Sequence, residues 1–272
     1  MKRWLARLVG AGVAVIFLLP LIWMVLASMR AASAVFDFDG VLRSESWTLG
    51  NYSAAWRRAD MPRALLTSGL QVGLISVAGL FVNALSAFAF ARLQFWGRDW
   101  LFAGVVALVI LPVEALAVPL LLTARDLGLT GGYAAALGGL TLPFVAKAFN
   151  IFLLRQHFMS LPRELEEAGA LDGAGVWDQF WAIALPAIRP ALVTVVLLDL
   201  LTHWNDFLWP LLIATRDETH TVQVGLANLF TEPPLDWGAI MACAVITTLP
   251  VLLCFRLFQR HLVPSDARAG LR

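Results

Sequence analysis

The chain has 272 residues, of which 60% are hydrophobic and only 14% are charged, and its net charge is +1 at pH 7. Soluble domains are about 45–50% apolar and about 25% charged, so this composition indicates a membrane protein. The nearly neutral charge argues against a nucleic-acid partner and against a polybasic tail.

The hydrophobic residues gather in six runs, each long enough to cross a bilayer as a helix of about 20 residues. The first run is longer than the apolar core of a cleaved signal peptide, which has about 7–15 residues, so we expect it to be retained. The predicted spans are residues 8–27, 64–91, 101–124, 133–154, 191–215 and 237–255. The predicted fold class is therefore all-α, a polytopic membrane protein with one transmembrane domain over residues 1–272.

The distribution of Lys and Arg orients these six spans. With the N-terminus inside, the inner segments hold twelve of these residues and the outer segments hold seven. Because cytoplasmic loops carry the excess of positive residues, we predict that both termini lie inside. The connection between spans four and five is then cytoplasmic.

That connection, residues 161–186, is charged and interrupted by glycine. Leu161, Leu165, Ala168 and Leu171 are spaced by four, three and three residues, which predicts one face of a short helix. Gly173-Ala174-Gly175 then breaks the helical pattern, and a second segment rich in aromatic residues follows. Such a helix pair either projects into a groove of a soluble partner or lies on the bilayer as an amphipathic loop. The residues by themselves leave both interpretations open.

A spaced motif in this connection resembles a known family. Glu167-Ala168-Gly169 is followed after three residues by Gly173, and after nine more by Ile183-x-Leu185-Pro186. This is similar to the Glu-Ala-Ala loop of bacterial ABC-importer permeases, with Gly169 in place of the second alanine. Further stretches resemble the carbohydrate-uptake, maltose-permease-like branch, and the similarity runs from about Asn51 to the C-terminus. These stretches are residues 87–102, 110–120, 152–174 and 203–212.

The resemblance implies the transmembrane permease subunit of an ATP-driven importer in the bacterial cytoplasmic (inner) membrane. Its substrate would be a sugar or related solute delivered by an extracytoplasmic solute-binding protein, which would meet the outer segment between residues 215 and 236. The other expected partners are a second homologous permease subunit, giving a heterodimer, and two ATP-binding cassette subunits. The cytoplasmic coupling helix would dock in a cleft of the ATPase and transmit its closure to the spans. The residues assigned to this coupling are Glu164, Glu167, Ala168, Gly169, Asp172, Gly173, Ala174, Ile183, Leu185 and Pro186.

The sequence gives no indication of an enzyme. It contains no G-x-x-x-x-G-K-[ST] phosphate loop and no paired His/Cys ligand set. We therefore expect no catalytic residue, no metal and no cofactor in this chain, with ATP and Mg²⁺ held by the partner ATPase.

Ionisable residues within the predicted spans are candidates for a substrate path, because such residues are costly in lipid and usually face the bundle interior or a cavity. Asp199, His203 and Asp206 follow an i, i+4, i+7 spacing, which predicts one helix face. Polar packing against a neighbouring helix is the alternative for these three, and interfacial anchoring is the alternative for Trp204. The assigned residues are Glu114, Lys147, Asp199, His203, Trp204, Asn205 and Asp206.

Lys147 and Asp199 lie at similar predicted depths, roughly 12–15 Å from the cytoplasmic interface at 1.5 Å per residue. Equal depth predicts an intramembrane ion pair, since each charge would be costly alone. Two alternatives stay open: each residue faces a watery path independently, or Lys147 pairs with Glu114.

A second class of function is an ion-coupled secondary transporter that uses the intramembrane carboxylates for protons, and a third is a membrane scaffold without transport. Secondary carriers often have repeated halves and interrupted helices. Neither feature is evident in this sequence.

Overall fold

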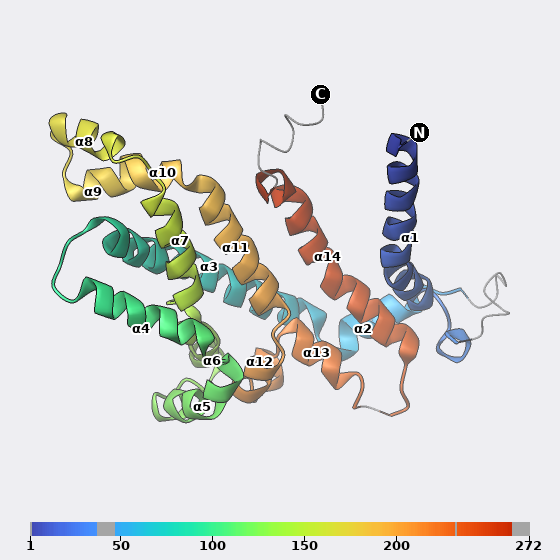
Figure 1. Cartoon of the computed structure of the whole chain (residues 1–272). Coiled ribbons are helices and arrows are strands. Elements are labelled where there is room, and N and C mark those ends of the chain that lie inside the picture. The colour runs from blue at the N-terminus through green and yellow to red at the C-terminus, as the bar shows by residue number, and fades with distance from the viewer. Residues whose placement is uncertain (1, 37–46, 232, 263–272) are drawn as a thin grey trace. The chain divides into compact units, whose positions relative to one another are not determined.

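The computed structural model describes residues 2–36, 47–231 and 233–262, and this part of the chain is built from helices, their connections and one isolated β-bridge between Arg30 and Trp47 (Figure 1). The chain divides into two compact units. The first comprises Met1–Leu66 and His220–Leu252, and the second comprises Thr67–Thr219 and Leu253–Arg272.

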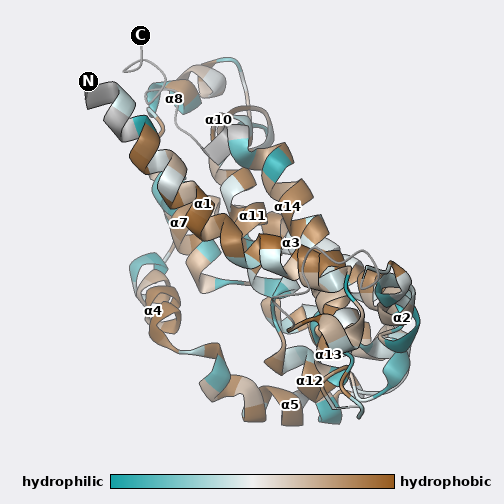
Figure 2. Ribbon diagram, turned by 90° about the vertical axis from the view of Figure 1, so that its right-hand side faces the viewer, coloured by the Kyte–Doolittle hydropathy of each residue, from teal (hydrophilic) through white to brown (hydrophobic). Residues whose placement is uncertain are grey.

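The first unit is organised around the end of its N-terminal helix. Asn51 Nδ2 donates hydrogen bonds to the backbone oxygens of Ser28 at 2.9 Å and Arg30 at 2.6 Å, which fixes α2 to the end of α1. Figure 2 shows that α1 is hydrophobic along most of its length, and none of its most apolar 18-residue stretch is buried. The helices are α1 (Lys2–Ser28), η1 (Ala32–Ala34), α2 (Gly50–Arg58), the start of α3 (Met61–Arg92), α13 (Val222–Asn228) and most of α14 (Trp237–Leu262).

The second unit contains the remaining helices and two hydrophobic clusters. One cluster centres on Phe88, Phe158 and Phe180, whose rings pack edge to face or tilted. The other includes Phe144 and Trp209. The helices are α4 (Arg98–Ile110), η3 (Val113–Leu116), α5 (Ala117–Asp126), α6 (Tyr133–Thr141), η4 (Leu142–Phe144), α7 (Ala148–Met159), α8 (Glu164–Leu171), α9 (Val176–Asp178), η5 (Gln179–Ala184), α10 (Leu185–Ala187), α11 (Arg189–Trp204), α12 (Leu208–Ile213) and η6 (Asp217–Thr219).

Among the described residues, three helices are long and apolar enough to cross a membrane, and the number rises to six if each of three bent pairs is one span. The straight candidates are Arg7–Ser28, Met61–Arg92 and Trp237–Gln259. The bent pairs are Arg98–Ile110 with Val113–Asp126, at 97°, Tyr133–Phe144 with Ala148–Met159, at 48°, and Val176–Ala187 with Arg189–Trp204, at 76°. The chain is thus an all-α polytopic protein, but the expectation of uninterrupted helices is wrong.

The predicted fifth span, residues 191–215, is one of the interrupted helices. α11 ends at Trp204, and α12 begins only at Leu208. Pro210 has no backbone N–H to donate within a helix continuing from α11, and Asp206 Oδ1 instead accepts a hydrogen bond from the Trp209 backbone N–H at 3.4 Å. Asp206 therefore lies beyond the end of α11, and the prediction that it shares a helix face with Asp199 and His203 is wrong.

Candidate functional site

The segment from α8 to α10 forms a tight helical hairpin, and in Figure 1 its two arms run side by side at the end of α7. α8 ends at a turn in which Gly173 has a φ of +86°. The Gly173 backbone N–H donates to the Ala170 oxygen at 3.0 Å, and the Ala174 N–H donates to the Gly169 oxygen at 2.9 Å. Glycine is favoured at Gly173 because L side chains rarely adopt a positive φ.

The two arms meet at Gly169 and Ile183. A β-carbon placed on Gly169 would lie 2.5 Å from Ile183 Cδ1, closer than real contacts allow. The absence of a side chain at Gly169 therefore permits the close approach of α8 to η5. Leu185 packs against the cluster formed by Phe88, Phe158 and Phe180, so the second arm is held by the hydrophobic core of the second unit.

The outer face of α8 is exposed. Leu171 is 90% exposed, and Leu165 and Ala168 are also exposed, so most of the apolar face predicted from the spacing is not covered by this chain. Three of the assigned carboxylates, Glu164, Glu167 and Asp172, are exposed as well, whereas Ala174, Ile183, Leu185 and Pro186 are half-buried. α8 consequently presents apolar and acidic side chains together to its surroundings.

One carboxylate of α8 that was not assigned a role faces the rest of the chain. Glu166 Oε1 lies 2.7 Å from Nε of Arg92, the last residue of α3. Sequence reasoning missed this pair because the two residues are far apart in the chain and no pattern links them.

A second set of polar residues surrounds the break between η4 and α7. Lys147 Nζ lies 2.7 Å from Asp199 Oδ1, which confirms the predicted ion pair. Lys147 therefore pairs with Asp199 rather than with Glu114, and the two charges do not face a watery path independently. Asn150 Nδ2 donates to both carboxylate oxygens of Asp199, at 3.1 and 2.9 Å, and only 1% of the Asp199 side chain is exposed.

A side chain of α3 caps the backbone at the break beside Lys147. Asn83 Oδ1 accepts the Lys147 backbone N–H at 2.9 Å. This N–H stands at the beginning of α7, where backbone donors have no partner within the helix. Asn83 thus satisfies the interrupted backbone, while the Lys147 side chain reaches Asp199 on α11.

His203 lies close to this ion pair and lines an adjacent cavity of about 420 Å³ together with Lys147, Phe144 and Phe149. Only 3% of His203 is exposed, and its ring centroid is 4.7 Å from that of Phe144. Neither ring nitrogen has a hydrogen-bond partner within the described chain. A neutral imidazole carries one donor and one acceptor, and both ring nitrogens of His203 are buried without a partner beside this cavity.

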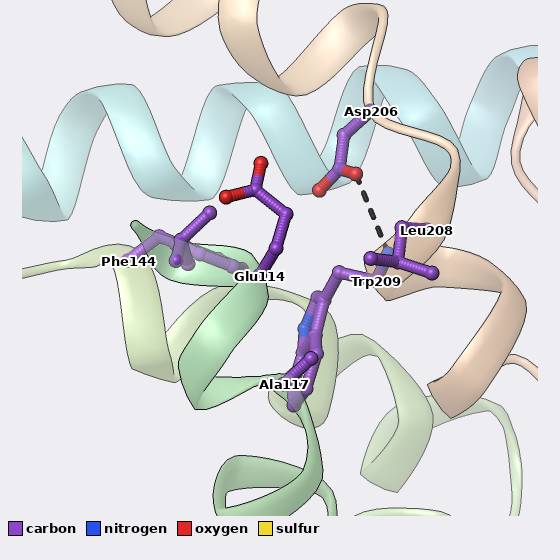
Figure 3. A pocket seen from close by; sticks show the side chains of 7 residues that line it. Glu114, Ala117, Phe144, Asp206, Leu208 and Trp209 are labelled. Atoms are coloured by element: carbon purple, nitrogen blue, oxygen red, sulfur yellow. Dashed lines mark hydrogen bonds between the residues drawn. The ribbon is translucent and has the colours of Figure 1, made fainter. Parts of the chain in front are cut away.

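Glu114 and Asp206 line a smaller neighbouring pocket of about 50 Å³, where their carboxylates face each other (Figure 3). Trp209 forms part of its wall, and its indole N–H donates to the Gly139 backbone oxygen at 3.1 Å. About 10–15 Å³ of such volume holds one water molecule, so this pocket has room for only a few waters.

The two other assigned path residues lie outside both pockets. Trp204 is buried, and the exposed Asn205 donates its side-chain N–H to the Leu201 backbone oxygen at 2.7 Å, at the end of α11. Lys147 and His203 therefore line one cavity, Glu114 and Asp206 line the second, and Asp199 lies buried outside both linings, where it contacts Lys147. Among the described residues, no group of three or more His, Cys, Asp or Glu side chains could hold a metal ion.

A family model described as the binding-protein-dependent transport system inner membrane component matches residues 75–265. The chain belongs to this family. It is a multi-pass inner-membrane component of an ATP-driven importer, and it is a transport subunit rather than an enzyme. This assignment confirms the resemblance to ABC-importer permeases and does not favour a secondary carrier, although the permease does have the interrupted helices that the sequence did not reveal.

Several curated relatives of this permease match over most of its length. The diacetylchitobiose uptake system permease protein NgcG of Streptomyces coelicolor is 30% identical over 95% of this chain and 85% of its own. The arabinooligosaccharides transport system permease protein AraQ of Halalkalibacterium halodurans is 28% identical over 99% and 96%. The sn-glycerol-3-phosphate transport system permease protein UgpE of Yersinia pestis is 36% identical over 74% and 73%.

The fold of the permease also resembles solved structures. A chain of a bacterial ABC transporter involved in the import of the acidic polysaccharide alginate aligns with a TM-score of 0.81, at 23% identity, over 97% of this chain and 98% of its own. A chain of the alginate transporter in complex with an alginate pentasaccharide-bound periplasmic protein aligns with a TM-score of 0.67 at 16% identity. At these identities the likeness concerns the fold.

Proposed function

We propose that this permease carries a carbohydrate delivered by an extracytoplasmic solute-binding protein. The single observation that supports this substrate class best is the near full-length similarity to permeases of diacetylchitobiose and arabinooligosaccharide uptake systems. The match to a glycerol phosphate permease covers less of the chain. A binding-protein partner is also consistent with the alginate transporter in complex with its periplasmic protein.

The proposed topology has six spans, with both termini inside and the whole chain acting as one permease domain. It counts each of the first two bent pairs as one span and takes α11 as the fifth. The hairpin from α8 to α10 then lies on the cytoplasmic side. The outer segment between residues 215 and 236 lies on the opposite side, where it meets the binding protein.

The proposed role of the hairpin is to receive work from an ATPase. Leu165 and Leu171 on α8 are exposed beside the carboxylates of Glu164, Glu167 and Asp172. A helix that presents apolar anchors within a polar rim suits a groove in a soluble partner. We assign that groove to an ATP-binding cassette subunit that holds ATP and Mg²⁺. The proposed assembly has two such subunits and a second homologous permease subunit.

The proposed substrate path passes the cavity at the break before α7. His203 and the donors of Lys147 that Asp199 does not use can bond sugar hydroxyls, while Phe144 and Phe149 offer apolar surface to the faces of a sugar ring. Glu114 and Asp206 bring negative charge close to this cavity, which disfavours an anionic substrate there.

This function is tested by co-expressing the tagged chain with the products of the adjacent genes and purifying the complex through the tag. We expect an ATPase and a second permease to co-purify, and we expect binding protein loaded with a neutral sugar to stimulate ATP hydrolysis in proteoliposomes. Inorganic phosphate and glycerol phosphate serve as the anionic comparison. Co-purification without an ATPase would contradict the importer assembly, and stimulation only by an anionic solute would contradict the proposed substrate class.

A further inference from the structure

The Arg92–Glu166 contact joins α8 to the end of α3 and is largely shielded from solvent. Only 8% of the Arg92 side chain and 17% of the Glu166 side chain are exposed. Arg92 Nε and Glu166 Oε1 make no hydrogen bond in the part of the chain that the structure describes, so their contact is an ion pair without hydrogen-bond geometry. By contrast, the side chains of the Arg216–Glu218 pair are 58% and 46% exposed. Breaking a largely buried pair leaves an uncompensated charge, whereas exposed pairs contribute little.

Arg92 also belongs to a reciprocal brace between α3 and α7. Its Nη2 donates to the Leu161 backbone oxygen, just after α7, at 2.7 Å. In return, Arg155 of α7 donates from Nε to the Phe90 backbone oxygen, at the end of α3, at 3.2 Å. The Arg155 guanidinium carbon also lies 3.9 Å from the centroid of the Phe102 ring on α4. The base of the hairpin is thus fixed to three helices by two arginines.

The two faces of α8 have different surroundings. Glu164 and Glu167 are exposed, whereas Glu166 between them turns inward to Arg92. The exposed carboxylates can contact a partner, whereas the Glu166 carboxylate contacts Arg92 of this chain. A displacement imposed on the exposed face would therefore be passed to α3 through Glu166 and Arg92.

The same helix leads to the polar cluster. Asn83 lies nine residues before Arg92 on α3, a distance of roughly 13 Å along a helix. Asn83 accepts the Lys147 backbone N–H, and Lys147 pairs with Asp199. A continuous series of contacts therefore runs from Glu166 through α3 to Asp199.

We propose that Arg92 and Glu166 are positioning residues that transmit movement of the coupling helix to α3 and hence to the substrate path. The inference rests on the proposed coupling function of the hairpin. It assigns the ion pair a role in the transport cycle, beyond holding the hairpin in place.

The test measures the number of substrate molecules imported per ATP hydrolysed, in proteoliposomes containing the complete transporter and loaded binding protein. We expect Glu166→Gln and Arg92→Gln each to lower this ratio at least fivefold while ATP hydrolysis continues. The charge-reversed double variant Arg92→Glu/Glu166→Arg should recover at least half of the lost ratio. Arg189→Gln is the matched control, because it removes an exposed arginine at the start of α11 and should leave the ratio unchanged.

A purely structural brace predicts a different result, in which transport and ATP hydrolysis fall in parallel and the ratio stays constant. That outcome would overturn the proposal, as would a double variant no better than the worse single. Glu166→Gln keeps the size of the side chain, so it remains informative if Arg92→Gln does not assemble. If the wild-type chain neither binds nor couples to an ATPase, the proposed function fails; if it couples and the variants couple equally well, only this inference fails.

Discussion

Lys147 Nζ lies 2.7 Å from Asp199 Oδ1, and Asn150 donates to both oxygens of the same carboxylate. This three-residue arrangement joins α11 to the beginning of α7, where the helical backbone is interrupted. The interrupted backbone is satisfied by Asn83 of α3. The break is therefore held by interactions from two other helices.

Removing one partner of this ion pair should destabilise the permease strongly. We expect Lys147→Met to lower the free energy of unfolding by about 3–5 kcal/mol, because the Asp199 carboxylate would remain buried with one donor fewer. The thermal midpoint of the detergent-purified chain measures the change. The double variant Lys147→Met/Asp199→Leu should be more stable than Lys147→Met, and the charge swap Lys147→Asp/Asp199→Lys should recover part of the loss. Equal midpoints for the single and both double variants would contradict the pairing.

The turn after α8 should tolerate a side chain at one glycine and not at the other. Gly173 has a φ of +86°, so Gly173→Val forces a β-branched residue into the left-handed region, at a cost of at least about 1–2 kcal/mol. Gly175 has a φ of −70°, and a β-carbon there would lie 3.6 Å from Asp178 Oδ2, an ordinary contact. We expect Gly173→Val to reduce ATPase co-purification and Gly175→Ala to leave it unchanged. Wild-type co-purification with Gly173→Val would argue against the coupling role.

The close contact between Gly169 and Ile183 predicts a compensating pair. Gly169→Ala places a β-carbon against Ile183 Cδ1 and should cost about 1 kcal/mol, since the far end of the isoleucine can move. Ile183→Val removes that Cδ1 atom. The double variant Gly169→Ala/Ile183→Val should therefore co-purify more ATPase than Gly169→Ala does. Additive losses in a double-mutant cycle would show that the two positions do not interact.

Leu171 offers a test that separates docking from folding. Because the side chain is 90% exposed, Leu171→Asp should change the free energy of unfolding by no more than about 0.5 kcal/mol. The same substitution should abolish co-purification of the ATPase if α8 docks through its exposed face. Leu127→Asp, at an exposed position outside the hairpin, is the control. Normal ATPase recovery with Leu171→Asp would exclude Leu171 from the interface.

His203 should affect substrate handling more than stability. His203→Phe keeps an aromatic ring beside Phe144 but removes both hydrogen-bonding nitrogens, neither of which has a partner in the described chain. Loss of one hydrogen bond of about 0.5–1.5 kcal/mol would raise the transport KM about two- to tenfold. The thermal midpoint should stay constant or rise. A KM equal to that of the wild type would place His203 outside the substrate path.

The hairpin could be predicted from the sequence because its signals are local. Charged residues and glycine interrupt two long apolar runs between spans four and five, and the spacing from Glu167 to Pro186 matches a family pattern. The Lys147–Asp199 pair could be predicted because both residues carry a cost in the membrane that pairing relieves. Arg92 and Glu166 carry no such signal, since their contact depends on how α8 folds back on α3.

The helix breaks could not be predicted in the same way. Pro112, Pro143 and Pro190 accompany the three bends, yet Pro20 and Pro250 lie within continuous helices. A proline removes one backbone donor in either case. Whether the helix then breaks depends on groups elsewhere, such as the Asn83 side chain that accepts the Lys147 N–H. The break before Pro210, which places Asp206 beyond the end of α11, could not be predicted for the same reason.

The salt bridge between Lys147 and Asp199 also determines how strongly a membrane potential can act on this part of the permease. A single charge crossing the full field gains or loses about 2.3 kcal/mol per 100 mV. Asp199 and Lys147 carry opposite charges 2.7 Å apart, so a rearrangement that moves them together displaces a small dipole with no net charge. The electrical potential does almost no work on this pair. A change in membrane potential therefore contributes almost no energy to a conformational change that moves this pair.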